Sequence, residues 1–167
     1  MLGRVTWAIA PTVRGRVSRE HVRRLAHDIR TLLRRAAPPR AGVELWICDD
    51  AQMSALHERH FGYPKPTDVL SFPAADEPVL AELDGESPSL GQIVVNADAV
   101  ARQAGVLGMP GMPGWFGEAR SLCIHAVAHL LGHDHATPGD ARAMLRAERR
   151  LGRALRVGVA RPYGGPG

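Results

Sequence analysis

The chain has 167 residues, of which 45% are apolar and 23% charged, an ordinary composition for one soluble globular domain. No apolar run approaches the ~20 residues of a membrane span, and two cysteines, Cys48 and Cys123, are too few for a disulfide framework. The net charge of +4 permits an anionic partner such as RNA without requiring one. We therefore expect a cytoplasmic domain over 1–160 with two buried thiols and no membrane partner, followed by a disordered tail over 161–167.

Apolar periodicity predicts strand, helix, strand and helix in the first part of the chain. The strands are expected over 5–10 and 43–48. Ser18 is a plausible N-cap for the first helix, which should end before a Pro-Pro pair. Asp50 can cap the second helix, which runs to about His60. On the first helix we favour a solvated polar face slightly over an RNA-contacting one. Its arginines are Arg23, Arg24, Arg30, Arg34 and Arg35.

Two further strands are predicted in the middle of the chain. They cover 69–72 and 91–96, and the polar, acidic stretch 74–89 between them reads as a surface loop. Asn96 can cap a helix that follows at once and ends at Gly105.

The last part of the chain predicts two helices after an irregular stretch. Residues 105–117 are rich in Gly, Pro and Met and are expected to be irregular. A helix over 118–131 should end at Gly132, and Thr137 should cap the final helix. Short strands mixed with helices, without strict alternation, predict an α+β fold with a small mixed sheet of about four strands and about five helices.

Half of the eight histidines fall in the eleven-residue window 125–135. His125 and His129 are four residues apart, so on a helix they share one face. Gly132 can turn the chain back and bring His135 to the same point. Three neutral imidazoles are good zinc ligands and leave a fourth position for a water that ionises near neutral pH. The pattern predicts one zinc per chain, held by these three histidines and used for hydrolysis.

Four neighbours of these histidines also carry expectations. His133 could compete as a ligand, but we rank His135 above it. Asp134 either orients a ligand histidine or only forms the turn. Leu130 and Leu131 are expected to face the core beside the site.

Two protein families share this histidine spacing. Metzincin proteases have His-Glu-x-x-His-x-x-Gly-x-x-His, in which the glutamate is the general base. Ala126 takes that position here, which argues strongly against a protease. The segment instead resembles the YbeY-type endoribonucleases, the rRNA maturation factor family, whose pattern is His-Gly-x-Leu-His-Leu-x-Gly-Tyr-Asp-His. The departures are Ala126, Ala128 and His133, none of them an expected ligand.

A second, separate segment supports the resemblance. Residues 66–73 read Pro-Thr-Asp-Val-Leu-Ser-Phe-Pro and match that family's segment without a mismatch. Residues 91–96 resemble its Gly-Asp/Glu-Ile-Val-Ile-Ser strand, and Met144 and Glu148 fall at its Met-x-x-x-Glu. The resemblance implies a zincin-like fold, a zinc on three histidines, and single-strand-specific endoribonuclease activity. It also implies a role with the small ribosomal subunit and its assembly proteins, in 3′-end maturation of 16S rRNA and ribosome quality control.

One departure from the family concerns a functional arginine. Many members carry Tyr-Arg-Gly shortly before the first proline of the segment that matches 66–73. The aligned residues here are His60-Phe61-Gly62, so Phe61 stands where the family has the arginine. Arg59 is therefore a candidate catalytic residue for phosphate binding, or only a surface residue of the short helix. His57 is a candidate RNA contact, whereas His60 reads as structural or surface.

Three hypotheses follow. The first is the zinc endoribonuclease, with attack on phosphorus by zinc-bound hydroxide or by a ribose 2′-OH. The second is a metallopeptidase, which would need a carboxylate such as Glu118 or Asp68 beside the metal. The third is a non-catalytic zinc-containing assembly factor with a closed site, completed by His133 or Cys123. None of the three uses a nucleotide cofactor, and nickel or cobalt would fit the same ligands as zinc.

Overall fold

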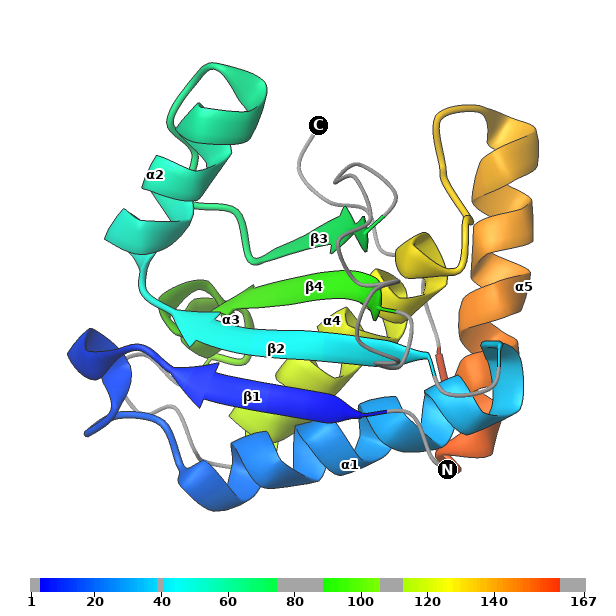
Figure 1. The fold of residues 1–167 in the computed structure, drawn as a ribbon, viewed down its shortest axis with the longest axis horizontal. Helices are drawn as coiled ribbons and strands as arrows, with labels where there is room; N and C mark the ends of the chain where they lie inside the picture. Colours follow the sequence, from blue (N-terminus) through cyan, green and yellow to red (C-terminus); the bar gives the residue numbers. More distant parts are fainter. Residues whose placement is uncertain (1–3, 39–40, 75–88, 106–112, 160–167) are drawn as a thin grey trace, which may run out of the picture.

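Four strands form one mixed sheet in the order β1-β2-β4-β3 (Figure 1). β1 pairs with β2 and β2 with β4 in parallel, while β3 runs antiparallel to β4. The strands are β1 Val5–Ile9, β2 Gly42–Cys48, β3 Val69–Pro73 and β4 Ser89–Asn96. All four predicted strands are confirmed, and in the part of the chain that the structure describes the sheet ends on β1 at one edge and β3 at the other.

The computed structural model describes residues 4–38, 41–74, 89–105 and 113–159. Within these residues there are five α-helices and one short 3₁₀ helix, Pro11–Val13. The α-helices are α1 Arg19–Ala36, α2 Asp50–Phe61, α3 Ala97–Gln103, α4 Pro113–Leu130 and α5 Pro138–Ala154. The α+β class is thus confirmed. The predicted tail over 161–167 and residues 75–88 of the predicted loop lie outside the described residues.

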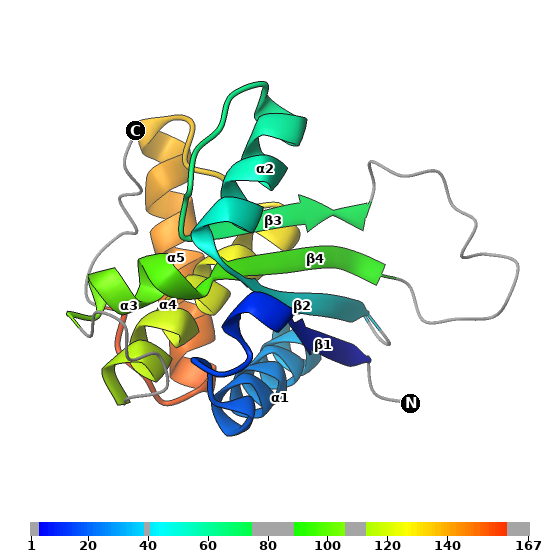
Figure 2. The same cartoon turned by 90° about the vertical axis from the view of Figure 1, so that its left-hand side faces the viewer.

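Helices α1 and α4 cover one face of the sheet, and α5 packs across them (Figures 1 and 2). The main core lies in this layer. It combines the apolar stripe of α1, including Leu25 and Ile29, with Ile47 and Ile93 of the sheet, all 0% exposed. Burying such side chains supplies most of the favourable free energy of folding. The core therefore fixes α4, which carries two of the candidate metal ligands.

Helix α2 covers the opposite face of the sheet near β3. A smaller apolar cluster attaches it: Met53 packs with Cys48 and Val94, and Leu70 and Phe72 border them. Side chains of a strand alternate between faces, so Leu70 and Phe72 of β3 point to α2 and Val69 points to the main core. The strand β3 is therefore shared between both layers.

The predicted helix caps are confirmed with one correction. Ser18 caps α1, Asn96 caps α3 and Thr137 caps α5 through their side-chain oxygens. Asp50 does not cap α2; Asp49 does, in a capping box with Gln52. The Asp50 carboxylate instead accepts hydrogen bonds from Arg102 and Asn96, tying α2 to α3 and β4.

The prediction of an irregular stretch up to residue 117 is wrong for its last part, because α4 begins at Pro113. Proline is tolerated in the first turn of a helix, where its missing N–H costs nothing. Trp115 is fully buried, and its indole N–H donates to the carbonyl of Ala97 at 3.2 Å. This tertiary contact holds a Gly-containing segment in a helix that its local propensity does not favour.

Both cysteines are buried free thiols, as predicted. Burial raises the pKa of Cys48 and of Cys123 to about 12, so neither is a reactive thiolate at neutral pH. Among the described residues, no helix combines the length and the apolarity needed to cross a bilayer.

Candidate metal centre

His125 and His129 lie one turn apart on α4 and approach each other closely. Their Nε2 atoms are 3.1 Å apart, and their ring centroids are 4.6 Å apart. The three residues between them, Ala126 to Ala128, are all buried, so core packing sets the orientation of the helix. This confirms that the four-residue spacing brings the two imidazoles together.

The turn after α4 brings in the third histidine. Gly132 has a φ of +88°, a left-handed conformation that a glycine adopts at little cost. Its N–H donates to the carbonyl of His129, and the N–H of His133 donates to that of Ala128. The chain then reverses, and the His135 ring lies 5.7 Å from His125 and 5.1 Å from His129, measured between centroids.

The three histidines fit a metal ion. Each offers one nitrogen, and these atoms lie within 4.8 Å of one another. Ligands at 2.0–2.1 Å from a tetrahedral zinc are about 3.3 Å apart, close to the 3.1 Å between the Nε2 atoms of His125 and His129. Exposure rises from buried His125 through half-buried His129 to exposed His135. The group is thus open to solvent on one side, where a fourth ligand can enter.

A buried glutamate contacts the Nδ1 side of the His125 ring. The Nδ1 atom of His125 lies 2.5 Å from Oε1 of Glu148 on α5, and Glu148 is 3% exposed. With Nδ1 engaged in this way, Nε2 is the nitrogen that faces the other histidines. From the sequence, Asp134 either orients a ligand histidine or forms the turn. Asp134 accepts from the backbone N–H of His135, which is the turn-forming alternative.

The electrostatics of the group favour neutral imidazole at its centre. Burial lowers the pKa of His129, and the neighbouring His125 and His135 lower it further. A hydrogen bond with the backbone of His133 acts in the opposite direction. Neutral imidazole is the form that coordinates a metal.

The other candidate ligands do not join the three histidines. Within the described residues, His133, Cys123 and the two carboxylates Glu118 and Asp68 all lie outside the group. Glu118 precedes His125 by seven residues, about 10 Å along a helix. Burial, followed by the charge of Asp68, raises the pKa of Glu118. The described residues thus offer neither a fourth protein ligand nor a carboxylate in the place of the protease glutamate.

Arg59 also lies outside the histidine group. It is exposed in the last turn of α2, on the helix that covers the other face of the sheet. Phe61, at the arginine position of the family, is 55% exposed. His57, the candidate RNA contact, is buried, and its Nδ1 lies 2.8 Å from the carbonyl oxygen of Tyr63. Its position is that of a residue that holds its neighbours in place.

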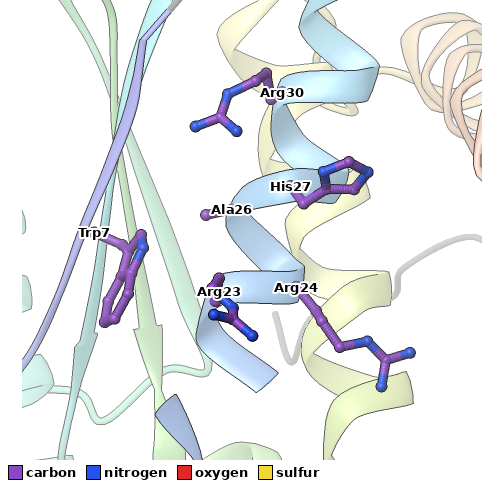
Figure 3. A pocket seen from close by; sticks show the side chains of 6 residues that line it. All are labelled: Trp7, Arg23, Arg24, Ala26, His27 and Arg30. Atoms are coloured by element: carbon purple, nitrogen blue, oxygen red, sulfur yellow. The ribbon is translucent and has the colours of Figure 1, made fainter. Parts of the chain in front are cut away.

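The arginine-rich face of α1 borders a groove of about 380 Å³ beside Trp7 of β1 (Figure 3). The arginines there already have partners within the chain. Arg23 pairs with Glu20, Arg24 lies over the Phe116 ring at 4.3 Å, and Arg30 donates to the Val5 carbonyl at 3.5 Å. The choice between a solvated face and an RNA-contacting one stays a prediction.

Comparison with known proteins gives consistent matches. The model of the family described as "Endoribonuclease YbeY" matches residues 12–156 of this chain. A protein of that name from Cutibacterium acnes is 46% identical over 110 residues, which cover 65% of this chain and 68% of the relative. Relatives of the same name from Anaeromyxobacter sp. and Thermobifida fusca are 35% and 36% identical. They cover 92% and 79% of this chain, and 73% and 82% of their own lengths.

The solution structure of TM1509 from Thermotoga maritima overlaps with 93% of this chain and 92% of its own. The TM-score is 0.48 and the identity 17%, a likeness from which nothing further follows. The family match spans most of the chain, including α1, the three histidines and Glu148. This chain belongs to the endoribonuclease YbeY family.

Proposed function

We propose that this chain is a zinc-dependent, single-strand-specific endoribonuclease that acts on the 3′ end of 16S rRNA in the cytoplasm, in maturation and in ribosome quality control. The observation that carries the proposal is the convergence of His125, His129 and His135 with one side open to solvent. Family membership supports the choice of RNA as substrate. Three imidazoles are a typical catalytic zinc set, which supports zinc over harder metals.

The chain's own residues have distinct tasks in this function. His125, His129 and His135 would hold the ion, and Glu148 would keep the His125 ring oriented through its Nδ1. When bound, zinc would supply Lewis acidity to the scissile phosphate and lower the pKa of a coordinated water. The exposed side of His135 leaves room for an RNA strand to approach. Exposed arginines, Arg59 among them, would neutralise phosphates.

The residues of the site also bear on the two competing functions, a peptidase and a non-catalytic assembly factor. Ala126 is buried and offers no carboxylate, which speaks against a peptidase. A non-catalytic assembly factor would bind the small subunit and its assembly proteins without cutting RNA. The open side of the histidine group favours catalysis over such a closed structural site, because structural zinc sites have four protein ligands.

The decisive experiment is cleavage of an end-labelled precursor RNA that contains the 3′ end of 16S rRNA. A His129→Ala variant purified in the same way controls for contaminating ribonuclease. We expect cutting by the original chain alone, within single-stranded RNA. A 2′,3′-cyclic phosphate on the upstream product would identify the ribose 2′-OH as the nucleophile, and a 5′-phosphate on the downstream product, with a 3′-hydroxyl on the upstream one, would identify water. Equal cutting by both proteins, or none, would refute the nuclease and support the assembly factor.

A further inference from the structure

Two solvent-exposed aromatic rings lie at the C-terminal end of α2. Phe61 and Tyr63 are each 55% exposed, and they are the large hydrophobic side chains exposed to this extent within the described residues. Other aromatic side chains, such as Trp115 and Phe116, are buried. Two neighbouring aromatic rings left exposed at one point are a common feature of binding surfaces.

The two rings are ordered by the buried His57. Its ring centroid lies 4.7 Å from that of Phe61 and 4.7 Å from that of Tyr63, the latter in an edge-on arrangement. Gly62 has a φ of +83°, which turns the chain between the two aromatic residues. The hydrogen bond between His57 Nδ1 and the Tyr63 carbonyl closes this turn. Rings that are fixed before binding lose little conformational entropy when a ligand arrives.

The surroundings of the rings are basic. Residues 57–65 contain Arg59, His60 and Lys65 but a single carboxylate, Glu58. His60 is exposed and its ring lies 4.5 Å from that of Phe72 on β3. Exposed aromatic rings beside cations suit a ligand that has both flat apolar faces and negative charges. Single-stranded RNA has both, in its bases and its phosphates.

The position of the rings relates them to the histidine group. Helices α2 and α4 lie on opposite faces of the sheet, but the end of α2 and the connection between α4 and α5 both lie beyond its edge strand β3 (Figures 1 and 2). β3 itself packs against α4 on one side and against the α2 cluster on the other. An RNA strand bound at the three histidines would reach the end of α2 if it continued over this edge.

We propose that Phe61 and Tyr63 form a base-stacking platform for single-stranded RNA, with Arg59 and Lys65 as the neighbouring phosphate contacts. The proposal deepens the proposed function and rests on it in one respect, that the substrate is RNA. Stacking accepts any base, because every base has a π face. The platform would therefore select unpaired nucleotides rather than a sequence.

The test measures binding of the full chain, as purified, to 2′-O-methyl RNA octamers, with gel analysis to confirm that they stay intact. A second octamer has the same backbone but no bases. We expect Phe61→Ala and Tyr63→Ala each to weaken binding of the base-containing octamer about tenfold. Binding of the abasic octamer should be unchanged. The matched controls Phe61→Trp and Tyr63→Phe keep a ring and should keep the affinity.

Each outcome bears on the platform separately from the nuclease. Unchanged binding in the alanine variants, or equal loss on both octamers, would overturn the platform, as would an original chain that binds neither octamer. Cleavage of precursor RNA by a chain whose alanine variants bind normally would leave the nuclease standing without the platform. Base-dependent loss in a chain that never cleaves would support the platform and refute the nuclease.

Discussion

Helices α4 and α2 lie on opposite faces of the same sheet and differ in how many of their residues are buried. Helix α4 is buried along most of its length, from Trp115 to Leu130. Helix α2 has only Met53 and His57 buried among its twelve residues. The candidate metal ligands are on the first helix, and the exposed aromatic rings are at the end of the second.

This difference separates two requirements of an RNA-cleaving enzyme. Metal ligands must keep their positions to within a few tenths of an ångström, which a helix packed in the core provides. Substrate contacts on a surface helix can change without disturbing the core. Phe61, which stands where the resemblance implies an arginine, is on α2, whereas the three histidines lie on and after α4. We therefore expect changes around α4 to have large effects and changes on α2 to have small ones.

The largest effect is expected for His129→Ala. Removing one of three ligands should reduce bound zinc from about one per chain to near zero and abolish RNA cleavage, because the ion is held at only three points. Elemental analysis of the purified protein measures the metal. His133→Ala is the matched control, since His133 is outside the group, and it should keep the metal. A His129→Ala protein that keeps its zinc would refute this ligand set.

Glu148→Gln tests the support behind His125. Glutamine has nearly the same shape but no charge, so the imidazole loses its buried carboxylate partner. We expect the zinc affinity to fall about 10- to 100-fold, measured by competition with a chromophoric chelator. Asp134→Asn is the control and should have a much smaller effect, because the hydrogen bond that Asp134 accepts within the described residues comes from the backbone of its own turn. Equal affinities for Glu148→Gln and the original chain would contradict this role.

Arg120→Ala tests how α4 is attached to α1. Arg120 Nε lies 2.7 Å from Oδ2 of Asp28, whose side chain is 11% exposed. The variant would leave a nearly buried carboxylate without its partner and should cost about 2 kcal/mol of unfolding free energy. Urea denaturation measures the cost, and Asp28→Asn in the same background should recover part of it. No loss in the single variant would show that the pair contributes nothing.

Asp49→Ala tests the cap of α2. Its side chain accepts the backbone N–H of Gln52 at 2.8 Å, so the variant should lose about 1 kcal/mol. Thr137→Ala removes the corresponding cap of α5 and gives the comparison. Urea denaturation again provides the measurement. A neutral Asp49→Ala would show that this cap contributes nothing to stability.

The smallest effect concerns pH. The hydrogen bond from Arg102 lowers the pKa of Asp50 below its usual 3.8. Because the folded pKa is the lower one, this pair stabilises the fold above about pH 4 and the stabilisation is lost as the pH falls further. Both side chains are more than a third exposed, so the contribution should stay below about 1 kcal/mol. Arg102→Ala should reduce stability more at pH 7 than at pH 2.5; an equal loss at both would contradict the assignment.

Much of the fold follows from local pattern. The stripe of Val22, Leu25 and Ile29 predicts α1, and each of these residues is 0% exposed. The misassigned positions depend on distant contacts. Helix α4 begins at Pro113 because Trp115 reaches Ala97, and no local pattern contains that contact. Asp49 and Asp50 are adjacent acids, and the partner of Asp50, Arg102, lies far along the chain.

The candidate site divides in the same way. The sequence by itself determined that His125, His129 and His135 would converge, because helical spacing and one glycine turn are local geometry. It did not determine which carboxylate supports them. Glu148 lies 23 residues from His125 and reaches it only because α5 packs on α4. Only the tertiary structure decided that, and only it placed Phe61 and Tyr63 in water, because exposure depends on what the rest of the chain covers.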